Sequence, residues 1–188
     1  MSIRKILHYG EPLLREPSKE VHKVSKKITE LVQDLLDTMY AKNGVGLAAP
    51  QIGENVRVFV IDVSTNKEPL NPMVFINPKI IKKSGAIKSN EGCLSFPEAY
   101  TDVRRYKNVM VKALNEHGKS FVLEAKDGTL LARAIQHEND HLDGVLFIDH
   151  CMNRFETESI LKKHNLPNLD VDKLVDEENL KKELGEND

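Results

Sequence analysis

Hydrophobic residues recur at helical spacing in two parts of the chain. From Ser25 to Lys42 they follow one another at alternating intervals of three residues and one residue, and Gly44 follows as a stop signal. Residues 130–142 show a second broad apolar stripe, and Gly144 follows it as a cap residue. We predict a helix in each part. The first helix is expected to pack on the core through an apolar stripe, which consists of Ile28, Leu31, Val32, Leu35, Leu36 and Met39.

The middle of the chain has the composition of β-strands. Residues 56–63 are mostly apolar and β-branched, which predicts a buried strand. Asn77-Pro78 interrupts the next apolar stretch, so we expect two short strands there, over 73–76 and 79–81. Residues 109–114 and 119–125 flank a turn signal and predict a hairpin. A further helix is predicted over 153–163, and strands between an early helix and late helices indicate an α+β fold.

Composition narrows the class of protein. The chain has 188 residues, of which 40% are hydrophobic and 30% charged, as in one globular domain. Lys and Arg number 27 against 29 Asp and Glu, so no overall charge favours nucleic acid, and we expect no direct DNA binding. No apolar run has the length of a membrane span, and the first residues lack a secretory signal, which favours a cytosolic enzyme.

The C-terminal part differs in charge from the rest. From residue 153 to 188 there are 6 basic and 10 acidic residues, and apolar residues are sparse. We expect a catalytic domain over 1–150, followed over 151–188 by a helix and an acidic, mobile tail.

The stretch 136–141 reads Gln-His-Glu-Asn-Asp-His and has His-Glu-x-x-His spacing. On a helix His137 and His141 lie on the same face and can bind one metal ion. Glu138 is then well placed to take a proton from a metal-bound water. Glu138 and His141 interrupt an apolar stripe, and burying them unpaired costs several kcal/mol. This cost favours a functional site over an ordinary charged surface.

Catalytic metal sites usually have three protein ligands and an open position. Cys93 in Glu-Gly-Cys-Leu-Ser (91–95) is a candidate third ligand, although a small buried hydrophobe is the commonest role of cysteine. Residues 44–53 are small, apolar and glycine-rich, and they lack the lysine of a phosphate loop. There Gln51 could donate an amide N–H to an oxygen, or the stretch could be a tight loop packed on the core.

Together, the three stretches closely resemble the peptide deformylase family, whose pattern is Gly-x-Gly-Leu-Ala-Ala-x-Gln, then Glu-Gly-Cys-Leu-Ser, then Gln-His-Glu-x-Asp-His. The resemblance runs from about Ile3 to about Asp149. It implies mostly antiparallel β-sheets around a central helix that carries the metal motif. It also implies that Cys93, His137 and His141 bind the metal and that the Glu138 carboxylate transfers the proton. The Gln51 side chain and the Leu94 backbone N–H would donate to the formyl oxygen. The substrate pocket would be formed by Gly44, Val45, Gly46 and Glu91.

The resemblance also implies a reaction. A family member removes the formyl group from N-formylmethionyl nascent polypeptides and releases formate, in a bacterial cytoplasm or an organelle. One divalent metal is expected, with Fe²⁺ as the native ion and Zn²⁺ or Ni²⁺ as replacements, since a thiolate and two imidazoles suit several metals. Ribosome proximity is expected, but the acidic tail argues against docking. Tyr100 stands where many relatives have arginine, and buried Glu91 should pair with Arg105 or Arg133.

Two other interpretations share part of the pattern. A zincin-type metallopeptidase would take its third ligand downstream, from Glu156 or Glu158. A structural zinc module would use Cys93, both histidines and Cys151 as four ligands with no open position. The other histidines show no ligand spacing and are expected to be surface or packing residues.

Overall fold

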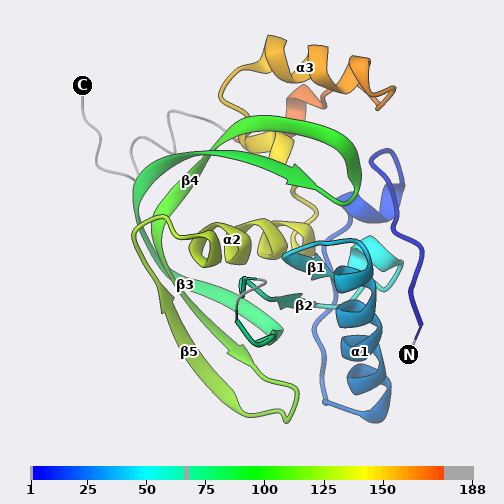
Figure 1. The fold of residues 1–188 in the computed structure, drawn as a ribbon, viewed down its shortest axis with the longest axis vertical. Coiled ribbons are helices and arrows are strands. Elements are labelled where there is room, and N and C mark those ends of the chain that lie inside the picture. The colour runs from blue at the N-terminus through cyan, green and yellow to red at the C-terminus, as the bar shows by residue number, and fades with distance from the viewer. Residues whose placement is uncertain (1, 66–67, 176–188) are drawn as a thin grey trace.

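A computed structural model describes residues 2–65 and 68–175 of the chain (Figure 1). Its described part is α+β and contains three α-helices beside one five-stranded sheet. The strands pair in the order β1-β2-β3-β4-β5, and every neighbouring pair is antiparallel. The helices are α1 (Lys26–Ala41), α2 (Leu130–Leu142) and α3 (Arg154–Lys163), and the strands are β1 (Gly46–Ala48), β2 (Val58–Ile61), β3 (Met73–Cys93), β4 (Phe96–Leu114) and β5 (Ser120–Ala125).

The predicted helices are present at nearly the predicted bounds. The apolar stripe of α1 packs against β1 and β2, where Leu35 and Met39 are fully buried. Thr129 precedes α2 and its hydroxyl accepts a hydrogen bond from the Ala132 backbone N–H at 3.4 Å. Gly144 ends the same helix with a φ of 71°, in the left-handed region that the sequence predicted.

The prediction of two short strands around Asn77-Pro78 is wrong. β3 runs without interruption through both residues, and a register shift against β4 lies between Ile76 and Lys79. Asn77 adopts a φ of 49°, and its side chain exchanges two hydrogen bonds of 2.8 Å with the backbone of Val21. The irregularity is therefore a bulge, which accommodates the missing N–H of Pro78 without ending the strand.

The largest departure from the sequence prediction is the length of the β3–β4 hairpin. Its two strands pair from Ile76 with Leu114 at one end to Cys93 with Phe96 at the turn. The sequence predicted only the parts of these strands that lie far from the turn. Figure 1 shows the hairpin as a curved arm, with α2 lying inside the curve and α3 outside it. The apolar face of α2 packs on the sheet through Ile135 and Leu142, which are fully buried. The hairpin turn thereby comes to lie beside α2.

The chain after α3 returns to the core. Leu169 is buried in an apolar cluster with Phe96 and Phe147, and the Tyr9 hydroxyl donates to the Asn168 carbonyl at 2.9 Å. The distal part of the predicted acidic tail, residues 176–188, lies outside the described residues. Within the described ranges no helix combines the length and the apolar character that crossing a membrane requires.

Candidate metal centre

Cys93 is the last residue of β3 and stands at the tip of the long hairpin. It pairs with Phe96, so Leu94 and Ser95 form a two-residue turn between the strands. Gly92 precedes the cysteine, and a Cβ atom there would lie 2.7 Å from Cδ1 of the Tyr100 ring. A Cβ atom at this position would force the Tyr100 ring to move, so glycine lets the ring pack directly on the backbone beside Cys93.

The hairpin tip and α2 bring three potential ligands together. One ligand atom each from Cys93, His137 and His141 lies within 4.8 Å of the other two, and Sγ of Cys93 is 3.3 Å from Nε2 of His141. Burial lowers the pKa of the His141 imidazole well below its ordinary value, so that ring is neutral. A thiolate and imidazole nitrogens are the donors that zinc and ferrous iron accept in proteins. The donor set therefore fits one divalent ion.

A buried network of charges holds His137. Its Nδ1 lies 3.1 Å from Oε2 of Glu91, and the Arg105 guanidinium donates to the same carboxylate at 2.8 to 3.2 Å. Burial opposes ionisation of Glu91, but Arg105 and His137 outweigh it and hold its pKa below the ordinary value. Since Nδ1 faces the carboxylate, Nε2 is the ring atom left to bind a metal. Of the two arginines suggested by the sequence, Arg105 is the partner of Glu91; Arg133 donates instead to Ser89 Oγ at 2.8 Å.

Glu138 lies against the glycine-rich loop. Cα of Gly46 approaches it so closely that a Cβ atom there would lie 2.9 Å from Cδ of the glutamate. Glu138 is 5% exposed, and its Oε2 has no hydrogen-bond partner within the described part of the chain. Burial raises the pKa of this carboxyl to about 7. A carboxyl with such a pKa is suited to accept and return a proton near neutral pH.

The Gln51 side chain also approaches Cys93. Its Oε1 accepts from the Ala48 backbone N–H at 2.9 Å, which fixes the orientation of the amide. Its Nε2 then donates toward Sγ of Cys93 at 3.4 Å and toward Ser95 Oγ at 3.2 Å. The amide N–H group is therefore held beside the three ligands.

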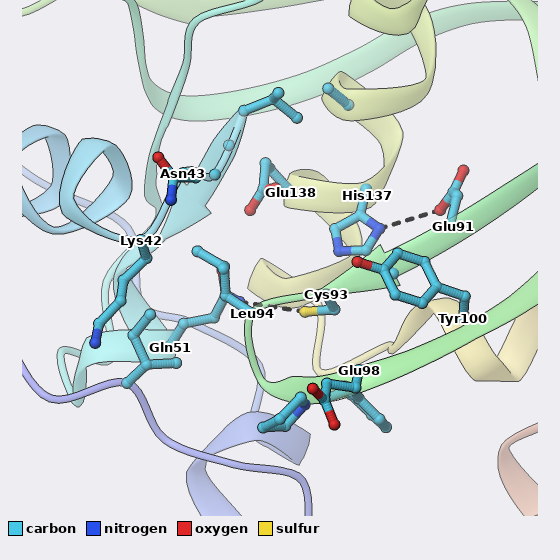
Figure 2. Close-up of a pocket in the computed structure, with 18 of the residues that line it drawn as sticks. Lys42, Asn43, Gln51, Glu91, Cys93, Leu94, Glu98, Tyr100, His137 and Glu138 are labelled. Carbon is cyan, nitrogen blue, oxygen red and sulfur yellow. Dashed lines mark hydrogen bonds and ion pairs between the residues drawn. The ribbon is translucent and has the colours of Figure 1, made fainter. Parts of the chain in front are cut away.

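These groups line one cavity of about 930 Å³. Figure 2 shows Cys93, His137 and Glu138 at its inner part, with Lys42 and Asn43 on one side and Tyr100 on the other. All ten predicted site residues except His141 contribute to its lining; they are Gly44, Val45, Gly46, Gln51, Glu91, Cys93, Leu94, His137 and Glu138. His141 is 1% exposed behind them. The structure thus brings together residues from three separate parts of the sequence.

Sequence reasoning missed three residues around the potential metal ligands. Asp140 accepts from Arg105 and lies 3.0 Å from Nε2 of His150, a residue expected at the surface or in packing. The Phe147 ring stacks on the His137 ring with centroids 5.8 Å apart. Asp140 stands between the two histidines in sequence and could have been suspected from that position. The roles of His150 and Phe147 left no signal in spacing or composition.

The two other arrangements of ligands are not observed. Glu158 of α3 pairs with Arg154 at 3.1 Å, and the group of potential ligands found within the described residues contains neither it nor Glu156. Cys151 is half-buried and lies outside that group as well. Neither the zincin-type site nor the four-ligand structural site is therefore favoured.

The fold and site define a class of protein, an α+β protein in which Cys93, His137 and His141 could hold a metal ion. The model of the family described as "Polypeptide deformylase" matches residues 3–157 of this chain. A peptide deformylase of Baumannia cicadellinicola is 49% identical over 163 residues, which cover 87% of this chain and 95% of the relative. Peptide deformylase 1 of Clostridium acetobutylicum is 50% identical over 149 residues, covering 79% and 95%. The chain belongs to the polypeptide deformylase family and is an enzyme of that kind.

Solved structures agree with this assignment. A peptide deformylase from Legionella pneumophila has a TM-score of 0.81 at 40% identity and covers 87% of this chain and 94% of its own. A peptide deformylase from Synechococcus elongatus, solved in complex with actinonin, has a TM-score of 0.81 at 37% identity and covers 93% and 95%. The α+β fold with one antiparallel sheet is therefore the family's fold.

Proposed function

We propose that this enzyme removes the formyl group from the N-terminal formylmethionine of nascent polypeptides through the Cys93, His137 and His141 centre. The observation that carries the proposal is the convergence of these three ligand atoms, within 4.8 Å of one another, beside a buried carboxyl and a fixed amide. Family membership supports the same reaction. The catalytic part then comprises residues 1–150, with α2 as its central helix, and 151–188 form a C-terminal helix and tail.

The three side chains would hold one divalent ion. A bound ion of this type supplies Lewis acidity and makes a water molecule acidic near neutral pH. We propose Fe²⁺ as the native ion, with Zn²⁺ or Ni²⁺ as replacements, because one soft thiolate and two imidazoles accept all three. Glu91 acts through His137: its carboxylate orients the ring and leaves Nε2 free.

The side chains around the ligands perform the remaining steps. Glu138 accepts a proton from the attacking water and returns it to the amine that leaves. The Gln51 amide and the Leu94 backbone N–H, which lies in the hairpin turn, donate to the oxygen on which negative charge develops. Both donors are fixed by the fold before substrate binds, because Gln51 is held by Ala48 and Leu94 by strand pairing on either side.

The substrate lies along the glycine-rich loop. Gly44, Val45 and Gly46 line the cavity opposite α2, where Leu130 and Ala134 add apolar surface. This wall receives the methionine side chain, and its glycines keep the wall close to Glu138 and Leu94. Because formylated chains arise in translation, we propose that the enzyme acts close to ribosomes in a bacterial cytoplasm or an organelle.

Formate release by a variant of Glu138 tests the proposed mechanism. The protein is purified without oxygen, its metal is measured by elemental analysis, and formate release from formyl-Met-Ala-Ser is assayed. We expect Glu138→Ala to retain one metal per chain and to lose turnover by roughly 10²–10⁴-fold, because the proton acceptor is removed while the ligands remain.

Glu30→Ala is the matched control, since Glu30 is an exposed residue of α1 that pairs with Lys26 on the surface. It should leave both metal content and turnover unchanged. Near-normal turnover in Glu138→Ala would remove this residue from its proposed role. Absence of formate release from the wild-type enzyme carrying metal would refute the proposed function itself.

A further inference from the structure

The charged groups at the mouth of the cavity are unevenly distributed. Four basic residues contribute to the lining of the cavity: Arg4, Lys5, Lys42 and Arg133. Arg4 is neutralised by Asp34 and Glu54, at 3.0 and 3.2 Å. Within residues 2–65 and 68–175, no ion pair joins Lys5, Lys42 or Arg133 to a carboxylate. Three cationic side chains of the lining are therefore without a counter-charge among the residues that the structure describes.

Acidic residues of the lining do not balance them. Glu91 is held by Arg105 and His137, and Glu138 is buried at the inner end. Glu98 remains at the mouth, but its side chain is 88% exposed and lies 4.0 Å from His164. The mouth of the cavity therefore has an excess of positive charge, although the whole chain has a formal net charge of −2.

The cavity has room for more than the formylated residue. Its volume of about 930 Å³ is near the upper end of the roughly 300–1,000 Å³ that small-molecule sites occupy. Figure 2 shows Lys42 across the cavity from Tyr100, with its amino group directed away from the sulfur of Cys93. Residues that follow the formylmethionine, each advancing about 3.3–3.6 Å when extended, must pass this mouth to leave the site.

We propose that Lys42 is a specificity-determining residue that favours formylated peptides with Asp or Glu directly after the formylmethionine. This inference rests on the proposed function and adds a preference among its substrates. An exposed ion pair contributes little in water, so the expected effect is a ranking of substrates. Lys5 and Arg133 contribute to the same positive potential, and Lys42 is an exposed member that lies in Figure 2 on the side of the cavity opposite Tyr100.

The test compares kcat/KM for formyl-Met-Asp-Ser and formyl-Met-Lys-Ser, with formyl-Met-Ala-Ser as the neutral reference. We expect the wild-type enzyme to favour the acidic peptide by about fivefold, as attraction at an exposed site predicts. Lys42→Glu should bring the ratio to one or below. Lys27→Glu makes the same change of charge at an exposed residue of α1 outside the cavity, and it should leave the ratio unchanged. Salt at about 1 M should reduce the wild-type ratio toward one.

The outcomes separate this inference from the proposed function. Formate release from the neutral peptide with equal rates for the two charged peptides overturns the substrate preference alone. A ratio that is unchanged in Lys42→Glu, or that changes as much in Lys27→Glu, also overturns it. A ratio that responds to Glu98→Gln and not to Lys42→Glu assigns the selection to the other side of the mouth and refutes the role of Lys42. No formate from any peptide refutes the proposed function first.

Discussion

The inner end of the cavity and its mouth hold their charged groups in different ways. At the inner end, the side chains of Arg105 and Glu91 are 2% and 8% exposed and are joined by several hydrogen bonds. At the mouth, Lys42 and Glu98 are exposed to solvent. Burial makes each inner charge dependent on its partners, whereas water solvates the outer charges and allows them to move. The inner end is therefore built for fixed geometry, and the mouth can only bias which substrates bind.

The largest effect is expected where a buried charge loses its counter-charge. Arg105→Met leaves the carboxylates of Glu91 and Asp140 buried, which should cost about 3–5 kcal/mol of unfolding free energy. Urea denaturation of the metal-loaded protein measures this cost. Lys88→Met removes an exposed partner of Asp102 and should have a much smaller effect, because water screens an ion pair at the surface. Equal stabilities of the two variants would contradict the difference between the inner end and the surface.

A smaller effect, on catalysis more than on stability, is expected at the glycine-rich loop. Gly46→Ala places a methyl group against the carboxyl of Glu138, which must then move. Displacing a catalytic group by about 1 Å can reduce turnover roughly 100-fold, and we expect a loss of that order in kcat with metal content unchanged. Gly53→Ala is a control that strains the backbone, whose φ is 88° at this residue, without contacting Glu138, because no atom lies within 4 Å of an added Cβ there. A normal kcat in Gly46→Ala would show that the loop does not position Glu138.

The smallest effect is expected at the second cysteine. Cys151 lies outside the group of potential ligands, so Cys151→Ser should retain one metal per chain and change stability by about 1 kcal/mol or less. Elemental analysis and thermal unfolding measure the two quantities. Release of the metal together with unfolding would instead support a four-ligand structural site. Cys93→Ser provides the comparison, since it should weaken metal binding.

Part of the site could be predicted because it depends on local geometry. The spacing of His137 and His141 alone places both rings on one face of a helix, and the helix is observed where the apolar stripe indicated it. Cys93 was suggested by its surroundings and by resemblance to a family. Its approach to the histidines depends on a hairpin tip that curves over α2, which no spacing in the sequence reveals.

The length of the β3–β4 hairpin could not be predicted for a related reason. Most of β3 between Ile81 and Lys88 is exposed or half-buried and lacks the alternation of a strand with one buried face. Its strand conformation comes from hydrogen bonds to β4, which are made between residues far apart in the sequence. A strand defined by its partner gives little signal in its own residues.

The sequence by itself determined the α+β class, the α1 and α2 helices and the placement of two histidines on one face of α2. Those properties follow from periodicity and from the chemistry of single side chains. Only the tertiary structure decided that Arg105 and not Arg133 pairs with Glu91, that Asp140 joins the same network, and that Gly46 lies against Glu138. These choices depend on distances between segments, and such distances are set by packing of the whole chain.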